Sequence, residues 1–447
     1  MKTTFRGGIH PPGMKELSNE CPLTRFVPKG EMVFPLSRHI GAPAKAVVRK
    51  GDRVLVGQPL AIAESVVSAN VFSSCSGTVK AIEKRRTISG QMLDCVVIDN
   101  DGRFEKTGLF GGRHDITDIT KEEIITRIRD AGIVGLGGAG FPTHVKLMPK
   151  EPDKIRYVIA NGAECEPYLT CNDQLMRTYS RQIVEGLEIV LRLFDNAEGV
   201  IAIEDNKPEA IRIMRRAVRG KKRISVLTMV TKYPQGGERS LIQAVADVDY
   251  PVSMLPADLG CIVNNVGTLY AIQRAVIHLE PLFSHVMTLS GEAVKEPANY
   301  IVPDGTMVWE ILEASGGLKE GVTLKKVLAG GPMMGVALPS LDVPVVKTTN
   351  GLTMLTEDAV DDVRRIMTSC LRCGRCNFAC PQGLEPMLMA EASRLGNYER
   401  YEKKLHGLEC ISCGTCSYVC PAKRPLTQIF RQARAEIMEM KKAGGKQ

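Results

Sequence analysis

Two cysteine groups with identical spacing stand near the C-terminal end of the chain. They read Cys370-x-x-Cys373-x-x-Cys376-x-x-x-Cys380-Pro and Cys410-x-x-Cys413-x-x-Cys416-x-x-x-Cys420-Pro. In this pattern three thiolates from one turn bind three irons of a cubane cluster, and the fourth cysteine ligates the other cluster. We therefore expect two [4Fe–4S] clusters that transfer single electrons. The first would use Cys370, Cys373, Cys376 and Cys420, and the second Cys410, Cys413, Cys416 and Cys380.

Two other uses of these cysteines fit less well. A structural zinc site needs four ligands, usually as two pairs, and has no use for a third cysteine at this spacing. A disulfide scaffold would require an oxidising compartment. The other six cysteines, which show no regular spacing, are expected to be free thiols: Cys21, Cys75, Cys95, Cys165, Cys171 and Cys261. The regular groups therefore favour iron–sulfur clusters.

The cysteine groups are embedded in helix-like sequence. Residues 385–395 and 398–405 lie between the groups, and an amphipathic stretch over 426–442 follows them. The first two stretches make the linker longer than that of a small bacterial ferredoxin. We therefore expect a helical ferredoxin domain.

A second candidate site is the glycine-rich segment Gly135-x-Gly137-x-x-Gly140. Its letters match a dinucleotide-binding fingerprint, but a helix-like stretch (120–131) precedes it and Pro142 follows where that fold would open a helix. Without side chains at Gly137, Gly138 and Gly140, a flat or phosphorylated ligand can approach bare backbone amides. A tight turn with no ligand remains the alternative for this segment alone.

Three further polar clusters follow or end apolar runs, as ligand-binding loops of an α/β sheet do. They span residues 161–167, 233–238 and 264–268. Around them, strand-like runs at 156–160, 199–203 and 224–230 alternate with helix-like stretches at 174–194 and 208–218. Such alternation predicts a Rossmann-like α/β layer.

The segment Gly-Leu-Gly-Gly-Ala-Gly-Phe-Pro-Thr (135–143), followed by Lys146, resembles the FMN- and NADH-binding subunit of respiratory NADH dehydrogenase. The three polar clusters match that family's flavin pocket in order and approximate spacing. The resemblance implies a non-covalent FMN site with Gly135, Gly137, Gly138, Gly140, Lys146, Asn161, Glu164, Tyr233, Gly236, Asn264, Asn265 and Thr268. Phe141, Glu166 and Glu238 would face NADH, and no side chain is expected to act as an acid or base. Leu136 and Gly237 depart from that family's usual Arg and Glu.

The whole chain resembles the C subunits of Rnf electron-transport complexes. The segments at 7–11 and 35–43 and the double cysteine motif carry this resemblance. It implies a multidomain α/β and α+β protein with four domains. These are a barrel-sandwich β domain (1–113), the FMN/NADH domain (114–282), a β-grasp, soluble-ligand-binding module (283–355) and the helical ferredoxin domain (356–447). Residues 64–71 contain no lysine, so we expect no lipoate or biotin on the first domain.

Composition and charge limit the setting of this chemistry. The chain has 447 residues, 24 % of them charged, and a formal net charge of +8, much of it in the seven Lys/Arg of residues 421–447. Basic residues without aromatic interleaving do not indicate nucleic-acid binding. We find no secretory signal and no long uncharged apolar run. We expect a peripheral protein on the cytoplasmic side of the cell membrane, docked to partner proteins.

These parts predict one function. NADH gives up two electrons together, whereas each cluster accepts one. FMN can exchange electrons either in pairs or singly, so it can link the two. We expect a peripheral NADH oxidoreductase subunit of an ion-translocating Rnf complex, bound to a membrane core and to an iron–sulfur, ferredoxin-like subunit. One alternative is a soluble flavin and iron–sulfur corrinoid reductase, and the domain at 30–112 would distinguish an Rnf subunit from such an enzyme. The other alternative is a flavin-free electron-wire subunit.

Overall fold

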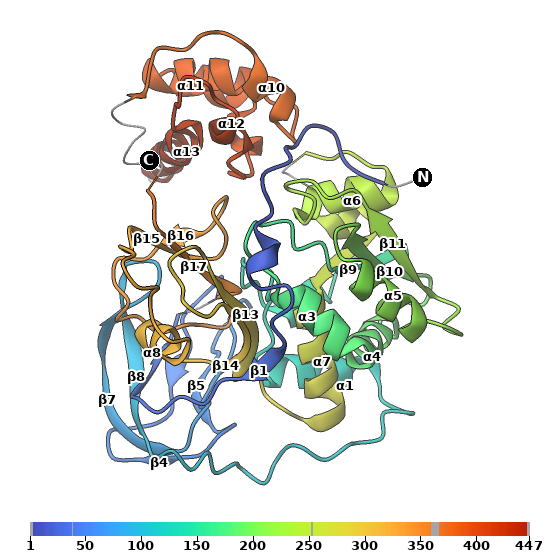
Figure 1. The fold of residues 1–447 in the computed structure, drawn as a ribbon. Helices are drawn as coiled ribbons and strands as arrows, with labels where there is room; N and C mark the ends of the chain where they lie inside the picture. Colours follow the sequence, from blue (N-terminus) through green and yellow to red (C-terminus); the bar gives the residue numbers. More distant parts are fainter. Residues whose placement is uncertain (1–2, 38, 252–253, 359–365, 445–447) are drawn as a thin grey trace.

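The chain folds into four modules that follow one another in sequence (Figure 1). The computed structural model describes residues 3–37, 39–251, 254–358 and 366–444. In Figure 1 the C-terminal helical module lies at the top, the α/β module at the right and the two β-rich modules at the lower left. The first described residues of the chain, in dark blue, run between the α/β module and the β-rich modules.

The first module consists of two small antiparallel sheets packed on each other. Their orders are β2-β8-β7-β4 and β3-β5-β6. The core between them is apolar and includes Phe34, Leu60 and Ile98, each fully buried. The strands are β2 (Met32–Pro35), β3 (Lys45–Ala46), β4 (Arg53–Val54), β5 (Pro59–Ile62), β6 (Val71–Phe72), β7 (Gly77–Arg86) and β8 (Met92–Asn100).

The α/β module is built on a four-stranded parallel sheet with the order β11-β10-β9-β12. The strands are β9 (Tyr157–Asn161), β10 (Glu198–Glu204), β11 (Ile224–Met229) and β12 (Cys261–Asn265). The helices are α1 (Lys121–Asp130), α2 (Thr143–Lys146), α3 (Cys171–Thr178), α4 (Ser180–Leu191), α5 (Pro208–Ala217), α6 (Glu238–Ala246) and α7 (Val266–His278), with the short turns η2 (Pro152–Lys154) and η3 (Pro256–Leu259). The predicted alternation of strands and helices is present.

Two features of this module show what starts and what interrupts its helices. Thr120 and Glu123 form a reciprocal capping box at the start of α1, which satisfies two otherwise unpaired backbone N–H groups. The helix predicted over 174–194 is wrong as a single element, because the chain leaves helical geometry at Tyr179. The Tyr179 ring packs on Tyr270 of α7, with 4.9 Å between ring centroids, and this tertiary contact accompanies the break.

The third module is a mixed sheet with the order β1-β14-β13-β17-β15-β16. Its strands are β13 (Ser284–Ser290), β14 (Ala298–Pro303), β15 (Lys326–Ala329), β16 (Val336–Ala337) and β17 (Gly351–Leu355), and α8 (Val308–Ala314) packs on them. The remaining strand, β1 (Leu23–Arg25), comes from near the N-terminus and pairs parallel with β14. The N-terminal segment therefore completes a sheet that lies more than 250 residues away in sequence.

The C-terminal module is helical around its cysteines, as predicted. It contains α10 (Arg375–Ala379), α11 (Pro386–Arg394), η4 (Arg400–Lys404), η5 (Gly407–Glu409), α12 (Thr415–Tyr418) and α13 (Leu426–Gly444). Tyr401, Phe430 and Ile437 are buried in its core, so the apolar face of α13 covers the cysteine-bearing turns. In the part of the chain that the structure describes, no helix is long and apolar enough to cross a bilayer.

Gly186 on α4 sets how closely α4 and α7 pack beside the sheet. A Cβ atom at this position would lie 2.0 Å from the Leu269 carbonyl oxygen of α7. We predict that Gly186→Ala destabilises the protein by about 2 kcal/mol despite the better helix propensity of Ala, because the helices must separate. This corresponds to a fall of roughly 4–8 °C in the midpoint of thermal unfolding.

The midpoint can be followed by circular dichroism. Gly108→Ala is the matched control, since a Cβ there meets no atom within 4 Å. An unchanged midpoint for Gly186→Ala would show that the helices can move apart without cost.

Candidate redox site

The strand order of the α/β module reverses beside β9, and we call the loops at this edge of the sheet the crevice. The chain proceeds from β9 to β10 and β11 on one side of the sheet, and then returns to place β12 on the other side of β9. Ligands of open α/β sheets bind at such a point, beyond the carboxyl ends of the strands. Asn161 ends β9 and Asn265 ends β12, and the two residues are register partners. The predicted polar clusters thus border the crevice.

The glycine-rich loop lies against the same edge. The Gly135 N–H donates to the Phe141 carbonyl oxygen (2.9 Å), which closes the loop, and the Leu136 N–H donates to Thr268 Oγ1 at the start of α7 (3.0 Å). A Cβ on Gly137 would stand 3.5 Å from Asn265 Cβ. The structure therefore brings Gly135, Gly137, Phe141, Asn265 and Thr268 together.

The outer part of this loop presents bare backbone. Gly138 and Gly140 have φ values of +117° and +66°, which side chains rarely tolerate. Gly137 and Gly138 are exposed, and a Cβ on Gly138 would meet no atom within 4 Å. A flat group can therefore approach the loop without meeting a side chain.

Lys146, at the end of α2, reaches across the crevice edge. Its ammonium group donates to the Val263 carbonyl oxygen of β12 (2.9 Å) and lies 3.5 Å from Glu238 Oε1 at the start of α6. Lys146 and Glu238, far apart in sequence, are thereby neighbours. Both are partly exposed, so a ligand can compete for this weak ion pair.

Asn161 connects two of the predicted polar clusters. Its side-chain amide donates to the Gly236 carbonyl oxygen (2.8 Å), while its oxygen accepts the Ala163 N–H (3.2 Å). The Gly236 N–H in turn donates to Cys165 Sγ (3.3 Å). A side chain at Gly236 would be tight, because its Cβ would lie 3.4 Å from both Cys165 Sγ and Ala163 Cβ.

Two predicted carboxylates have protein partners. The Glu164 carboxylate accepts the N–H groups of Asn172 (2.7 Å) and Asp173 (3.2 Å) at the start of α3. The Glu166 carboxylate accepts the N–H groups of Met333 (3.0 Å) and Met334 (2.8 Å) from the β-grasp module, and burial raises its pKa. Their contacts with flavin and nucleotide stay predictions.

Buried polar atoms without protein partners test whether the crevice fits a polar, planar cofactor. Among the described residues, Asn264 Nδ2 on β12, Thr143 Oγ1 at the start of α2 and Ser240 Oγ on α6 are buried and unpaired. Unpaired buried polar groups are costly and uncommon in folded proteins. The exposed backbone of Gly137 and Gly138 and the nearby Lys146 ammonium group offer accessible donors to a flat, phosphorylated ligand, so the residues present fit FMN.

The eight cysteines surround two separate cavities. Cys370, Cys373, Cys376 and Cys420 line one, and Cys380, Cys410, Cys413 and Cys416 line the other. The structure thus brings together the four cysteines predicted for each cluster, including the exchange of the fourth cysteine between the two groups. Their role as ligands remains a proposal.

Within the described residues, no group of three or more His, Cys, Asp or Glu side chains is placed to hold a single metal ion.

The two cysteine turns share the same backbone design. Gly374 and Gly414 each follow the second cysteine of their group and have φ values of +74° and +86°. The N–H of Arg372 donates to Cys370 Sγ, and that of Ser412 to Cys410 Sγ, both at 3.4 Å. Amide hydrogen bonds to cysteine sulfur stabilise added negative charge and influence cluster potential.

The two cavities differ in their surroundings, which the sequence did not reveal. Cys413 and Cys416 are buried, and burial raises the pKa of Cys416 to about 12 and that of Cys380 to about 11. Cys370 and Cys373 are exposed. Iron binding at the buried group must therefore displace protons from thiols.

The buried cavity is the one that adjoins the α/β module. The Tyr233 hydroxyl donates to the Cys413 carbonyl oxygen (2.8 Å), and its ring is fully buried with Cys413, Ala379 and Ile9. Arg239 on α6 contacts Gln382 Oε1 (3.0 Å) and Glu409 Oε2 (3.2 Å). One cysteine group therefore faces the crevice, and the other faces outward.

Comparison with known proteins places this arrangement in a family. The C subunit of the proton-translocating ferredoxin:NAD(+) oxidoreductase complex of Clostridium ljungdahlii is 41 % identical over 98 % of this chain and 94 % of its own. The C subunit of the Na(+)-translocating ferredoxin:NAD(+) oxidoreductase complex of Acetobacterium woodii is 40 % identical over 99 % and 98 %. The chain belongs to this family of C subunits. The resemblance to Rnf C subunits is thereby confirmed.

Family models match each of the four modules. They are the RnfC barrel sandwich hybrid domain (residues 3–103), the Nuo51 FMN-binding domain (128–274), the SLBB domain (286–337) and a 4Fe-4S dicluster domain (362–421). The predicted fold class and the two predicted cofactor-binding domains are confirmed. A solved NAD+-reducing [NiFe]-hydrogenase in the air-oxidized state is 21 % identical, with a TM-score of 0.48 over 70 % of this chain and 66 % of that one.

The exchange of the fourth cysteine gives a sharp prediction. We expect Cys376→Ala and Cys420→Ala to disturb the same cluster, although they belong to different sequence groups, because both line one cavity. Each should lower the iron content by about one cluster, four of eight irons, and leave the same remaining spectrum. Iron analysis and electron paramagnetic resonance of the reduced proteins measure this.

Cys413→Ala should remove the paramagnetic resonance signal of the other cluster, because Cys413 lines the other cavity. Cys21→Ser, whose native thiol donates to the Pro297 carbonyl oxygen in the β-grasp module, should leave both signals. If Cys420→Ala instead reproduced the spectrum of Cys413→Ala, the ligand sets would be wrong.

The unpaired amide of Asn264 yields a second prediction. Asn264→Leu removes a buried donor that has no protein partner, so the FMN-free protein should be as stable as the wild type or more so. FMN affinity should fall by about tenfold, as for the loss of one buried hydrogen bond to a ligand. Flavin fluorescence quenching and thermal unfolding test the two effects. Equal FMN affinity would show that Asn264 does not face the cofactor.

Proposed function

We propose that this chain is the peripheral FMN- and NAD(H)-binding iron–sulfur subunit of a membrane-bound ion-translocating complex. It would exchange electrons between NAD(H) and an iron–sulfur partner, and ultimately ferredoxin. The observation that carries the proposal is the contact between residues 233–238 and a predicted cluster cysteine: Tyr233, three residues from Gly236, donates to the Cys413 carbonyl oxygen. Direct packing would thus join a two-electron site to a one-electron carrier.

We infer an order of the electron carriers from these contacts. The group Cys380, Cys410, Cys413 and Cys416 would hold the cluster that exchanges electrons with FMN, because it packs on the α/β module. The group with Cys370 would hold the outer cluster. FMN in the crevice would supply the exchange between hydride and single electrons, while the chain positions the groups and excludes water.

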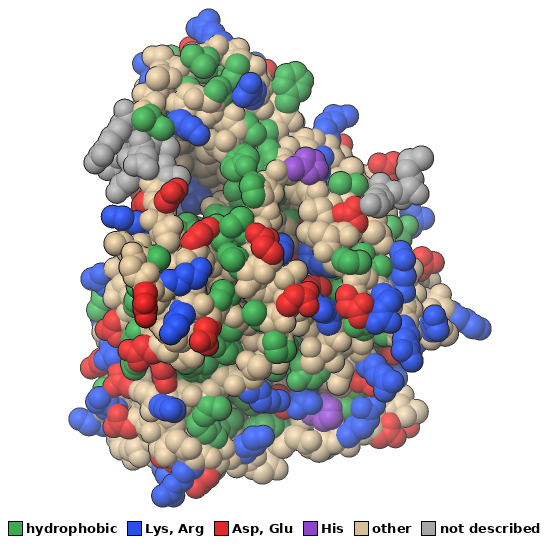
Figure 2. All heavy atoms as spheres, in the orientation of Figure 1, with side chains coloured by type: hydrophobic (Ala, Val, Ile, Leu, Met, Phe, Trp, Pro, Cys, Tyr) green, Lys and Arg blue, Asp and Glu red, His purple; other side chains and the backbone are tan. Residues whose placement is uncertain are grey.

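The outer cluster would face the partner protein. Arg375, Lys423, Phe378 and Tyr418 line a groove beside Cys420, and the Phe378 side chain is 84 % exposed. Figure 2 shows apolar and basic side chains over this helical module, at the top of the view. A basic rim around an apolar centre suits an acidic, ferredoxin-like subunit. Peripheral binding on the cytoplasmic face fits thiolate ligands, which need a reducing compartment.

The barrel-sandwich module favours this function over the corrinoid reductase. The match of residues 3–103 to the RnfC domain supports the first candidate, since the predicted difference between the two lies in this region. A flavin-free electron wire would not need the open glycine backbone at Gly138 or the unpaired donors of the crevice.

The experiment is anaerobic reconstitution of the full chain with FMN and iron, followed by titration with NADH. We expect one yellow FMN per chain, bleached by NADH, with reduction of both clusters. In Cys413→Ala, which lacks the inner cluster, NADH should still bleach FMN but should reduce the outer cluster much more slowly. Stopped-flow absorbance separates the two events.

Two results would contradict the proposal. If the reconstituted protein showed iron–sulfur absorbance without bound FMN, the electron-wire hypothesis would replace it. If the outer cluster of Cys413→Ala were reduced at the wild-type rate, the order of the clusters would be wrong.

A further inference from the structure

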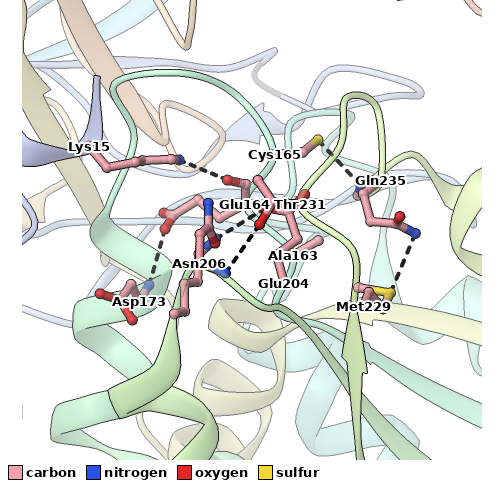
Figure 3. A network of polar contacts seen from close by, with 12 residues as sticks. Lys15, Ala163, Glu164, Cys165, Asp173, Glu204, Asn206, Met229, Thr231 and Gln235 are labelled. Atoms are coloured by element: carbon pink, nitrogen blue, oxygen red, sulfur yellow. Dashed lines mark hydrogen bonds and ion pairs between the residues drawn. The ribbon is translucent and has the colours of Figure 1, made fainter. Parts of the chain in front are cut away.

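Lys15 lies behind the loop of residues 162–170, which joins β9 to α3, and belongs to a segment far from this loop in sequence. Its ammonium group donates to three backbone carbonyl oxygens of that loop, those of Glu164 (2.8 Å), Glu166 (2.8 Å) and Leu169 (2.5 Å). Figure 3 shows the side chain reaching across to Glu164. An ammonium group has three protons, so these three bonds use its full donor capacity.

The loop needs such support because its backbone is strained. Glu164 and Tyr168 have φ values of +53° and +69°, a conformation that residues other than glycine rarely adopt. Such residues persist only where their surroundings hold them in place. In addition, three carbonyl oxygens that point at one position repel each other unless a cation occupies it.

The position of Lys15 is itself fixed on both sides. It begins the short helix η1 (Lys15–Leu17), and the Gly13 carbonyl oxygen just before it accepts the Tyr168 N–H (2.9 Å). After it, Ser18 Oγ lies 2.7 Å from Thr170 Oγ1. The N-terminal segment thus follows the loop from residue 13 to residue 18, and the lysine occupies the middle of this contact.

Lys15 as a whole is partly exposed, but its ammonium group is surrounded by the three loop carbonyl oxygens. Desolvation lowers its pKa, and the nearby carboxylates of Glu164 and Glu204 oppose that effect. The other buried ammonium in this region, that of Lys207, is bound to Glu204 (3.2 Å) and Asn206 (2.8 Å). The loop carbonyls therefore depend on Lys15 for their cation.

The front of the same loop carries crevice residues. Asn161 binds the Gly236 carbonyl oxygen and the Ala163 N–H, and the Glu164 carboxylate caps α3. A change in the backbone at Glu164 therefore shifts both the start of α3 and the asparagine at the end of β9.

We propose that Lys15 is a positioning residue for the flavin crevice: its ammonium group takes the place of a bound cation at the centre of the loop and holds Asn161 in its binding geometry. This inference rests on the proposed FMN site. It also assigns a role to the N-terminal segment, which contributes to a site in another module without contacting the cofactor itself.

The test compares Lys15→Met and Lys15→Ala with the wild type in the full chain. Loss of a group that makes three charge-assisted bonds should weaken FMN binding by tenfold or more. Amide hydrogen exchange of the FMN-free protein should become faster in residues 161–170. The matched control is Lys232→Met, which removes another lysine bound to the N-terminal segment, at the Phe5 carbonyl oxygen (2.9 Å), and should alter neither property.

Chemical rescue separates the charge from the packing. Lys15→Ala removes the part of the side chain that corresponds to propylammonium, so added propylammonium matches the vacated space. Propylammonium should restore FMN affinity and slow exchange in residues 161–170, whereas 1-propanol, of similar size but neutral, should not. A merely structural role for the side-chain volume would predict rescue by both.

The outcomes distinguish this inference from the proposed function. If the wild type binds FMN, and Lys15→Met shows the same FMN affinity and the same amide exchange, only the role of Lys15 is overturned and the proposed function stands. Rescue by 1-propanol as effective as by propylammonium overturns the role of the charge. If the wild type bound no FMN, the proposed function and the flavin part of this inference would both fail, whereas faster exchange in residues 161–170 would still support the role of Lys15 in the loop.

Discussion

The hydrogen bond from the Tyr233 hydroxyl to the Cys413 carbonyl oxygen joins the α/β module to the ferredoxin module. On one side, the chain continues within three residues to Gly236, whose carbonyl oxygen holds Asn161 at the end of β9. On the other side, Cys413 belongs to the buried cysteine group. Electron transfer requires carriers to be close, and packing between rigid elements is the means by which this chain holds the crevice and the cysteines at one separation.

The elements around this junction come from every part of the chain. The Gly8 N–H donates to the Ala379 carbonyl oxygen (3.0 Å), and a Cβ on Gly414 would lie 3.1 Å from the Met333 carbonyl oxygen. Glu166 binds the amides of Met333 and Met334. The N-terminal segment, the β-grasp module and the ferredoxin module therefore meet beside the α/β module. A junction built from four segments is hard to open locally.

Buried charges near the sheet edge are paired rather than isolated. The Glu204 carboxylate lies 3.2 Å from the Lys207 ammonium group, and both side chains are almost completely buried. Lys15 has three carbonyl partners, and Asp173, whose pKa burial raises to about 6, lies 3.4 Å from Arg177. Such groups lose hydration on folding, so each depends on its partner remaining in place. These paired charges therefore fix the conformation of the loops behind the crevice.

Much of this protein follows from local sequence. The spacing of the cysteines determined which residues enclose each cavity, because a short turn with a left-handed glycine leaves few ways to arrange three thiols. The alternation of apolar runs determined the parallel sheet, and Thr120 with Glu123 determined the start of α1. Tertiary structure alone decided that Tyr179 divides a helix and that the N-terminal strand β1 joins a distant sheet. It also decided which cysteine group faces the crevice and what Lys15 binds. The two cysteine groups have the same spacing, and the sequence around Lys15 does not indicate its partners. The sequence could not decide either point, because each depends on a contact between residues more than 140 positions apart.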